Sequence, residues 1–468
     1  MSNGKNVLLI LCDQLQRQVL GPYGGQVPTP NLDKLAARSA VYDNFYCATP
    51  LCIPTRPSMM TGRWPHAHGA TSFGKGFDTI HSSERLLIDH LVDHGYHVGY
   101  EGIWHINCHP EDQRSNEYAH FLPRGFPYED HLRMMIEQGG SDGDQRAPVK
   151  TPTDSGRIHD WEISIPVPVC WTDDPKDHPD CEIARSISDF IRSAPAEKPF
   201  AAWCSLGGPH PPILVPEPYY SMFSPNEMTP PTSFGEDPST LPGPVRDAPG
   251  AQSVRDWQWE DWAKSTAVYW GFVAYLDHCI GLVMEGLEAS GRAENTIVLA
   301  TCDHGEMMGA HNLYQKGVFY DESIHIPFML SGPDISPGRR RQFGSQVDIP
   351  STLVELLGLS KMVNVQGKSL VPSLQNAESA GEQVAYVEFN GYTDGGIHTR
   401  GIVSDRYKYV YHHHDSDQLF DLEEDPSEIR DISIHPDYGE IREILRNQLA
   451  TWMVSTGDFI EPSWPAQS

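Results

Sequence analysis

One cysteine of this chain lies in a sequence setting that favours a functional role. Cys52 begins the run Cys52-Ile53-Pro54-Thr55-Arg56, and the run Met60-Thr61-Gly62-Arg63 follows closely. A lone cysteine is ordinarily a small, buried, apolar side chain. Here no C-x-x-C pair accompanies the thiol, and a proline and an arginine frame it instead. The run therefore marks Cys52 as a candidate reactive residue.

Acidic residues and a histidine close two apolar runs that lie far apart in the sequence. Asp13 ends the first run of the chain, and Asp303 and His304 follow the apolar run at 296–302. Buried parallel strands present functional residues at their carboxyl ends, so these side chains can meet at one sheet edge. Carboxylate and imidazole groups are ligands for divalent metals. An isolated Asp after a strand is more often a helix cap, so the metal site depends on both strand ends together with Cys52.

The segments that would carry these residues alternate between strands and helices. Continuous apolar runs predict strands buried on both faces, and apolar residues three or four apart predict covering helices. Alternation of this kind is typical of an α/β fold. The expected strands are Asn6 to Cys12, Phe200 to Leu206, Thr296 to Cys302 and Ile326 to Leu330, and the expected helices begin after Thr29, at Ser83 (to His94) and at Thr266 (to Ser290).

Composition divides the rest of the chain. The stretches 106–180 and 209–255 are rich in Pro, Gly, Asp and His, and we expect them to form excursions around the site. A polar linker near 375–382 indicates a boundary between a catalytic α/β domain over 1–375 and a smaller α+β domain over 383–468. The smaller domain is expected to hold an antiparallel sheet with strands at Val384 to Phe389, Gly401 to Ser404 and Tyr407 to Tyr411, and a terminal helix at Ile441 to Met453.

The run at Cys52 resembles the sulfatase signature C-x-P-x-R followed by TGR, in which the cysteine is oxidised after translation to formylglycine. Other motifs of the sulfatase family, within the alkaline-phosphatase-like superfamily, follow in the family's order along nearly the whole chain. The resemblance implies the fold of that superfamily, with a mixed, mostly parallel sheet flanked by helices. The matching motifs are Thr29-Pro30-Asn31-Leu32-Asp33, Trp104-His105, Pro209-His210-Pro211, Asp303-His304-Gly305-Glu306 and Lys316.

The resemblance also implies a divalent metal, with calcium as the family's usual choice and manganese as the alternative. The residues that would hold the metal are Asp13, Asp303, His304 and the oxidised Cys52. Arg56 would hold the formylglycine hydrate. The side chains that would contact the transferred group are His105, His210 and Lys316, because such donors neutralise the charge that develops in the transition state.

A formylglycine hydrate carries two geminal hydroxyls, which explains the need for these side chains. One hydroxyl attacks sulfur or phosphorus, and the other later loses a proton so that the hemiacetal collapses and expels the bound oxyanion. The metal lowers the pKa of the nucleophile and draws electron density from the nonbridging oxygens. His105 is the candidate base for the collapse, and either Lys316 or His210 would support the leaving oxygen.

The metal motifs depart from the commonest sulfatase pattern at two positions. Gln14 follows Asp13 where the family usually has a second Asp, and His304 follows Asp303 where it usually has Asn. Fewer carboxylates would therefore surround the metal. This combination resembles the phosphonate monoester hydrolase and choline-sulfatase branches, and it makes Gln14 a candidate substrate donor.

A further departure removes a positive charge. Ile103 stands where the family usually has a lysine that contacts the sulfate, and the phosphonate monoester hydrolases also lack this lysine. Arg114 or Arg124 could restore the charge. In the smaller domain, His398 and Arg400 fit a substrate contact and a solvated strand edge equally well.

Composition limits the partners of the chain. Its 34 Lys and Arg against 63 Asp and Glu give a net charge of −29, which disfavours nucleic acids and anionic membranes. The nine scattered cysteines argue against a disulfide framework. We recognise neither a signal peptide nor an apolar stretch of about 18 residues, so we expect a cytoplasmic protein. The sequence is compatible with a homo-oligomer.

These features predict a formylglycine-dependent hydrolase of a small anionic sulfate monoester, matured by a formylglycine-generating enzyme. A phosphonate monoester or phosphodiester hydrolase with the same nucleophile is the first alternative. Because sulfur and phosphorus centres are both tetrahedral, one site can also act on both. A noncatalytic anion-binding protein with an unmodified Cys52 is the second alternative.

Overall fold

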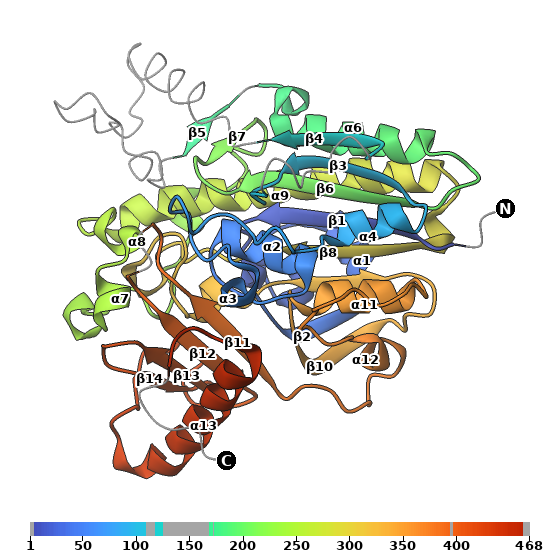
Figure 1. The fold of residues 1–468 in the computed structure, drawn as a ribbon. Coiled ribbons are helices and arrows are strands. Elements are labelled where there is room, and N and C mark those ends of the chain that lie inside the picture. Colours follow the sequence, from blue (N-terminus) through green and yellow to red (C-terminus); the bar gives the residue numbers. More distant parts are fainter. Residues whose placement is uncertain (1–3, 109–117, 125–167, 172, 394–395, 462–468) are drawn as a thin grey trace.

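The computed structural model describes residues 4–108, 118–124, 168–171, 173–393 and 396–461. A large eight-stranded sheet and a separate four-stranded sheet dominate the fold (Figure 1). The large sheet has the strand order β10-β2-β9-β8-β1-β6-β3-β4. Its neighbouring strands run parallel except where β9 pairs antiparallel with β2 and β8. The expected mixed, mostly parallel α/β architecture is confirmed.

The central strands of the large sheet are the apolar runs that the sequence singled out. β1 is buried along its whole length and pairs with β6 on one side and β8 on the other. The strands of this sheet are β1 (Asn6–Asp13), β2 (Ala40–Tyr46), β3 (His97–Ile103), β4 (His120–Arg124), β6 (Phe200–Pro209), β8 (Thr296–Cys302), β9 (Phe328–Ser331) and β10 (Gly338–Ser345). A short parallel pair, β5 (Val169–Cys170) and β7 (Leu214–Val215), lies outside it.

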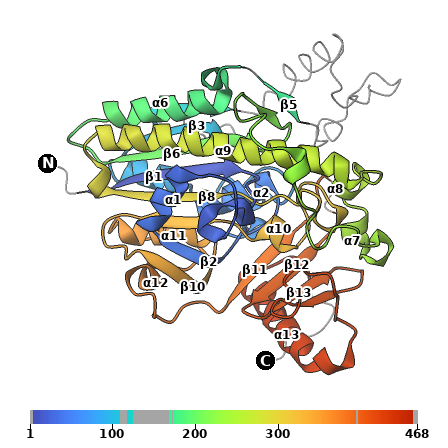
Figure 2. The same ribbon diagram turned by 180° about the vertical axis from the view of Figure 1, so that it is seen from behind.

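Helices cover both faces of the large sheet. Figure 1 shows α2, α4 and α11 on one face, and Figure 2 shows α1, α6 and α9 on the other. The helices of this part are α1 (Pro30–Ala37), α2 (Cys52–Thr61), α3 (Pro65–His68), α4 (Leu87–Asp93), α6 (Pro179–Ser193), α7 (Gly243–Arg246), α8 (Pro249–Gln252), α9 (Trp259–Ala289), α10 (Asp321–Ile324), α11 (Asp348–Leu356) and α12 (Val371–Gln375). The excursion at 209–255 contains β7, α7 and α8, whereas most of the 106–180 excursion lies outside the described residues.

The helix α9 begins earlier than the expected Thr266. The side chain of Gln258 accepts a hydrogen bond from the backbone of Asp261, whose side chain accepts one from the Gln258 N–H, and this capping box fixes the start. Contrary to the sequence expectation, α9 is long and apolar enough to cross a membrane by length and composition alone, because an 18-residue window within it has a mean hydropathy of 1.4. Within the fold 78% of that apolar window is buried, and its packing against α6 and β6 accounts for the composition.

The second sheet is antiparallel and follows residues 376–383. Its strands are β11 (Val384–Phe389), β12 (Thr399–Ser404), β13 (Tyr407–His412) and β14 (Gln418–Asp421), and the helix α13 (Gly439–Thr456) packs against β12 and β13. β11 also lies next to β2 and β10 of the large sheet. This contact places the start of the smaller sheet beside the elements that lead to the site.

Candidate active site

Polar side chains gather at the carboxyl edge of the large sheet. Parallel strands end on the same side, so residues far apart in the sequence meet there. The residues that follow or end these strands are Asp13 of β1, His105 after β3, His210 after β6, and Asp303 and His304 after β8. Cys52 joins them as the first residue of α2.

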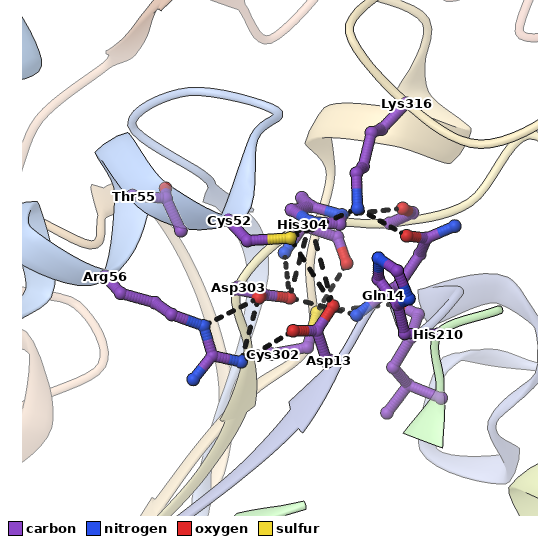
Figure 3. A network of polar contacts seen from close by, with 12 residues as sticks. Asp13, Gln14, Cys52, Thr55, Arg56, His210, Cys302, Asp303, His304 and Lys316 are labelled. Carbon is purple, nitrogen blue, oxygen red and sulfur yellow. Dashed lines mark hydrogen bonds and ion pairs between the residues drawn. The ribbon is translucent and has the colours of Figure 1, made fainter. Parts of the chain in front are cut away.

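A single arginine joins the two aspartates of the site (Figure 3). The Arg56 Nη2 donates to Asp13 Oδ2 at 2.8 Å, and its Nε donates to Asp303 Oδ2 at 3.1 Å. The remaining Nη1 donates to the Ser205 hydroxyl at 2.8 Å and to the Ile103 carbonyl. All three ionic side chains are buried. Among the described residues, the hydrogen bonds of Arg56 thus go to the two carboxylates and to strands β3 and β6, and its contact with a formylglycine hydrate stays a prediction.

The two aspartates differ in electrostatic environment. Burial and the neighbouring charge of Asp303 raise the pKa of Asp13 to about 8, although Arg56 opposes this. Burial acts in the same direction on Asp303, but the charges of Arg56 and Lys316 and an N–H from Gln14 hold its pKa below its usual range. Two adjacent buried carboxylates with one shared guanidinium favour a further cation.

The ring of His304 has a defined orientation. Its Nδ1 lies 3.0 Å from the Gly305 carbonyl, which can only accept, so Nδ1 carries the proton. Burial lowers the pKa of His304 to about 3, which keeps the ring neutral. The unprotonated Nε2 therefore faces the Cys52 sulfur at 3.0 Å. A neutral imidazole with its other nitrogen fixed by a carbonyl is the usual form of a metal-ligating histidine.

The Cys52 side chain points into this group of residues. Its Sγ lies 3.1 Å from Lys316 Nζ and 3.7 Å from Asp13 Oδ1. Burial and the charge of Asp13 raise the pKa of the thiol, and Lys316 only partly offsets them. A protonated, buried thiol is a weak nucleophile, unlike the thiolates of reactive cysteines. The position at the start of α2 nevertheless favours negative charge on residue 52 through the helix dipole.

Lys316 belongs to a chain of polar contacts that extends away from Cys52. Its Nζ donates to Gln14 Oε1 at 2.6 Å, and Gln14 Nε2 donates to Glu306 Oε2. The other oxygen, Glu306 Oε1, accepts the backbone N–H groups of Met308 at 2.9 Å and Gln315 at 2.7 Å. Figure 3 shows Lys316 and Arg56 approaching from different sides, with Gln14 near Lys316.

His105 and His210 are both held neutral. Burial and the Arg56 charge lower the pKa of His105 to about 3, and its backbone has a left-handed φ of 47°. Burial and Lys316 lower the pKa of His210 well below its usual value. The Nδ1 of His210 donates to the Pro211 carbonyl, so Nε2 of the neutral ring is an acceptor.

The residues present fit a divalent metal. One ligand atom from each of Asp13, Cys52, Asp303 and His304 lies within 4.8 Å of the others. In this structure the Cys52 sulfur marks the place that the oxygens of a formylglycine hydrate would take. Carboxylate oxygens are ligands of hard divalent cations, and an imidazole nitrogen is a ligand of divalent transition metals.

Other candidates from the sequence do not join this group of described side chains. The Arg400 guanidinium is buried and bonds to Asp458 through Nε at 2.5 Å and Nη2 at 2.9 Å. His398 bonds to Asn390 at 3.0 Å. The backbone of Arg124 pairs with Ile103 at the end of β4, and Arg114 lies outside the described residues.

The structure adds residues that sequence reasoning missed. Ser205 binds Arg56 from within β6, and Gln346 donates to the backbone carbonyls of Cys302 at 2.9 Å and Asp303 at 2.7 Å. The Tyr392 hydroxyl donates to the Lys316 carbonyl. None of these three carried a motif or a charge in the sequence, and each reaches the site only through the folded arrangement.

A mixed, mostly parallel sheet flanked by helices is the alkaline-phosphatase-like fold, and this group of side chains lies at its carboxyl edge. The chain belongs to the sulfatase family, because the family model described as Sulfatase matches residues 5–359. It is accordingly an enzyme of the sulfuric ester hydrolase class. A second model, described as N-sulphoglucosamine sulphohydrolase, C-terminal, matches residues 309–455.

Several sulfatases are similar to this protein over most of the chain. An arylsulfatase of Clostridium perfringens is 26% identical over 471 residues, which cover 95% of this chain and 93% of that protein. A choline-sulfatase of Rhizobium meliloti is 26% identical over 470 residues, which cover 93% of this chain and 84% of that protein. The solved structure of the phosphonate monoester hydrolase of Agrobacterium radiobacter has a TM-score of 0.81 and 24% sequence identity. The match covers 97% of this chain and 96% of that one, and the two proteins share their fold.

Proposed function

We propose that this protein hydrolyses a small sulfate monoester with a formylglycine nucleophile derived from Cys52 and one divalent metal. The observation that carries the proposal is the placement of residue 52. It begins α2 and faces Lys316, His304 and Asp13 at distances of 3.1, 3.0 and 3.7 Å. The buried thiol itself has a raised pKa and is a weak nucleophile, which supports its conversion to an aldehyde hydrate.

The metal would be held by Asp13, Asp303, His304 and residue 52, with calcium as the first choice and manganese as the alternative. When bound, it would lower the pKa of the attacking hydroxyl and draw electron density from the nonbridging oxygens. Arg56 keeps the two aspartates in place through separate nitrogens. Its contacts with Ser205 and the Ile103 carbonyl fix the guanidinium, so the carboxylates are oriented before substrate arrives.

Lys316 is the side chain that we assign to the leaving oxygen. The sequence left Lys316 and His210 as equal candidates for this role. With its Nδ1 donating to the Pro211 carbonyl, the neutral His210 ring has only an acceptor at Nε2 and cannot give a proton. The ammonium of Lys316 has donors to spare and lies beside residue 52. His210 would instead accept a hydrogen bond near the transferred group.

His105 remains our candidate base for release of the bound oxyanion. Burial and the Arg56 charge keep the His105 imidazole unprotonated, and the negative charge of the bound group would raise its pKa toward the range that suits a general base. Formylglycine would supply a second hydroxyl at residue 52 whose proton this imidazole removes.

A second candidate activity, hydrolysis of phosphonate monoesters or phosphodiesters, is favoured by two positions. Gln14 contributes a neutral amide where a second carboxylate is common in the family, and Ile103 contributes a buried apolar side chain instead of a cation. Both features make the site less specialised for sulfate. We therefore expect measurable phosphorus-ester turnover at the same nucleophile.

The test measures kcat/KM of metal-replete protein on matched aryl sulfate, aryl phosphonate and aryl phosphodiester substrates. Cys52→Ala is the control, and mass spectrometry of the peptide that contains residue 52 measures conversion to formylglycine. Dominant sulfate hydrolysis that Cys52→Ala abolishes supports the proposal. Dominant phosphorus-ester turnover assigns the second activity, and an unmodified thiol with anion binding but without turnover supports the noncatalytic alternative.

A further inference from the structure

The carboxylate of Glu306 is buried beneath the site without touching the nucleophile. Its side chain has no exposed surface, and both of its oxygens are engaged. Oε1 accepts the N–H groups of Met308 and Gln315, while Oε2 accepts from Gln14 Nε2. A carboxylate can only accept, so the amide of Gln14 must turn its NH₂ toward Glu306.

This orientation determines what Gln14 offers on its other side. With the NH₂ directed at Glu306, the carbonyl Oε1 faces Lys316 Nζ and accepts from it at 2.6 Å. An amide turned the other way would present NH₂ to an ammonium, and two donors cannot bond to each other. Because Glu306 accepts a hydrogen bond from the Gln14 amide, the amide oxygen is left to accept from Lys316 and fixes the position of its ammonium.

The amide of Gln14 is also fixed at its backbone, so it cannot easily move to relieve a mismatch. Its N–H donates to Asp303 Oδ1 at 2.9 Å, and its carbonyl accepts from the Tyr269 hydroxyl at 2.8 Å. Gln14 has a left-handed φ of 63°, which the two bonds hold. Side-chain rotation of the amide is thus the main freedom that remains.

We propose that Glu306 is a positioning residue that sets the amide orientation of Gln14 and thereby holds the Lys316 ammonium beside residue 52. The inference rests on the proposed function, because Lys316 is assigned there to the leaving oxygen. It goes beyond that function by assigning a role to Glu306, which is linked to Lys316 by two successive hydrogen bonds through Gln14 and keeps the ammonium in place. A supporting residue of this kind typically changes activity about 10- to 100-fold when it is replaced.

The decisive variant is Glu306→Gln, which keeps size and one carbonyl oxygen. That oxygen can still accept from Met308 and Gln315, so the surrounding loop has no cause to unfold. The new NH₂ at position 306 faces the NH₂ of Gln14 and forces the Gln14 amide to rotate. Lys316 then loses its acceptor. We expect kcat to fall about 10- to 100-fold with little change in KM, and a larger loss for substrates with poor leaving groups.

The compensating variant Glu306→Gln/Gln14→Glu reverses the polarity of the whole chain of contacts. The new carboxylate at position 14 can accept from the new amide at 306 on one side and from Lys316 on the other. We expect this double variant to regain most of the kcat that Glu306→Gln loses. Gln14→Glu alone sets two carboxylates against each other, and we expect it to stay impaired.

Two further measurements separate positioning from general structural support. Glu388→Gln replaces another fully buried glutamate, whose carboxylate bonds to His66 and Asn390, and should leave kcat per folded molecule unchanged. Crystal structures of Glu306→Gln and of the double variant report the Lys316 Nζ position without any turnover. In the first we expect Lys316 to have left its contact with Gln14, and in the second to have regained it.

The inference is overturned if Glu306→Gln has wild-type kcat, or if Lys316 keeps its position in the crystal. It is also overturned if Glu306→Gln and Lys316→Ala reduce kcat by independent factors that multiply in the combined variant, because residues acting as one unit are not additive. Absence of ester hydrolysis by the wild-type protein contradicts the proposed function instead, and the crystal structures still decide the position of Lys316.

Discussion

The molecule contains two buried clusters of charged side chains that use similar residue types. The catalytic cluster consists of Asp13, Cys52, Arg56, Asp303, His304 and Lys316. The interface cluster consists of His66, Glu388, Arg400 and Asp458, and it joins α3 to the second sheet. Three members of the interface cluster also lie close enough together to hold a metal ion by distance alone.

The interface cluster neutralises each carboxylate with its own cation. Asp458 takes two hydrogen bonds from Arg400, and these outweigh burial and lower the pKa of Asp458. Glu388 binds the ring of His66 and its backbone N–H. Burial acts to lower the pKa of His66, but the charge of Glu388 prevails and raises it. The carboxylates of this cluster are thus already paired with His66 and Arg400, and these pairs connect the two parts of the fold.

The catalytic cluster shares one guanidinium between two carboxylates. The second oxygen of Asp13 faces the Cys52 sulfur and the His304 Nε2 at 3.9 Å, and the pKa of Asp13 is raised rather than lowered. The pairing of each carboxylate therefore distinguishes the two clusters better than their composition. Individually paired carboxylates form a structural link, whereas an underneutralised pair facing an imidazole nitrogen favours the binding of a cation.

Removal of the divalent metal is expected to have the largest effect, and only on the catalytic cluster. Chelation should lower kcat/KM by about 10³-fold or more, because the lost charge stabilisation amounts to several kcal/mol. Metal at 100 times its Kd should raise the free energy of unfolding by about 2.7 kcal/mol, measured by calorimetry. The control is Asp458→Asn, which should keep this gain, whereas an equal gain in Asp303→Asn would contradict the assignment.

Breaking the interface pair should affect stability instead of chemistry. Arg400→Met leaves the buried Asp458 carboxylate without its guanidinium, and the free energy of unfolding should fall by about 3–5 kcal/mol in urea titrations. The kcat per folded molecule should stay unchanged. The double variant Arg400→Met/Asp458→Leu should recover part of the loss. A large fall in kcat would instead return Arg400 to the substrate-binding role that the sequence allowed.

Tyr392 tests whether the second sheet contributes to the catalytic cluster as well. Its hydroxyl donates to the Lys316 carbonyl, and loss of one such bond costs about 1 kcal/mol. We expect Tyr392→Phe to lower kcat about fivefold. Tyr386→Phe, on β11 and stacked against Trp452, is the matched control and should leave kcat unchanged. Equal effects of both substitutions on kcat would show that the contact is unimportant.

The smallest expected effect concerns the pH dependence of stability. Because the pKa of His66 is raised in the folded state, its contribution is complete below the unfolded value of about 6.5 and is lost as pH rises through the folded value. The free energies of unfolding of wild type and His66→Gln should therefore converge as the pH rises from about 6.5 through the raised pKa of folded His66. The charged groups that face the ring are Glu388, Asp458 and Arg400. A difference that grows with pH would contradict the raised pKa.

Local patterns predicted the elements that present the catalytic cluster. The apolar runs ending before Asp13 and Asp303 fold as β1 and β8, because strands buried on both faces need continuous apolar sequence. The predicted start of β11 at Val384 is also confirmed. By contrast, β10 carries three successive arginines, and no apolar pattern marks it as a strand. Its pairing with β2 depends on tertiary contacts, as sheet edges often do.

The sequence by itself determined the family, the fold class and the candidate residues of the site, because local motifs and apolar runs indicate each of them. Only the tertiary structure decided their bonding. It directed Arg56 to the two aspartates, tied Glu306 to Lys316 through Gln14, and placed Arg400 in the interface cluster. The physical reason is that hydrogen-bond polarity and charge pairing depend on which groups share a buried volume, and residues almost 300 positions apart enter that volume only after folding.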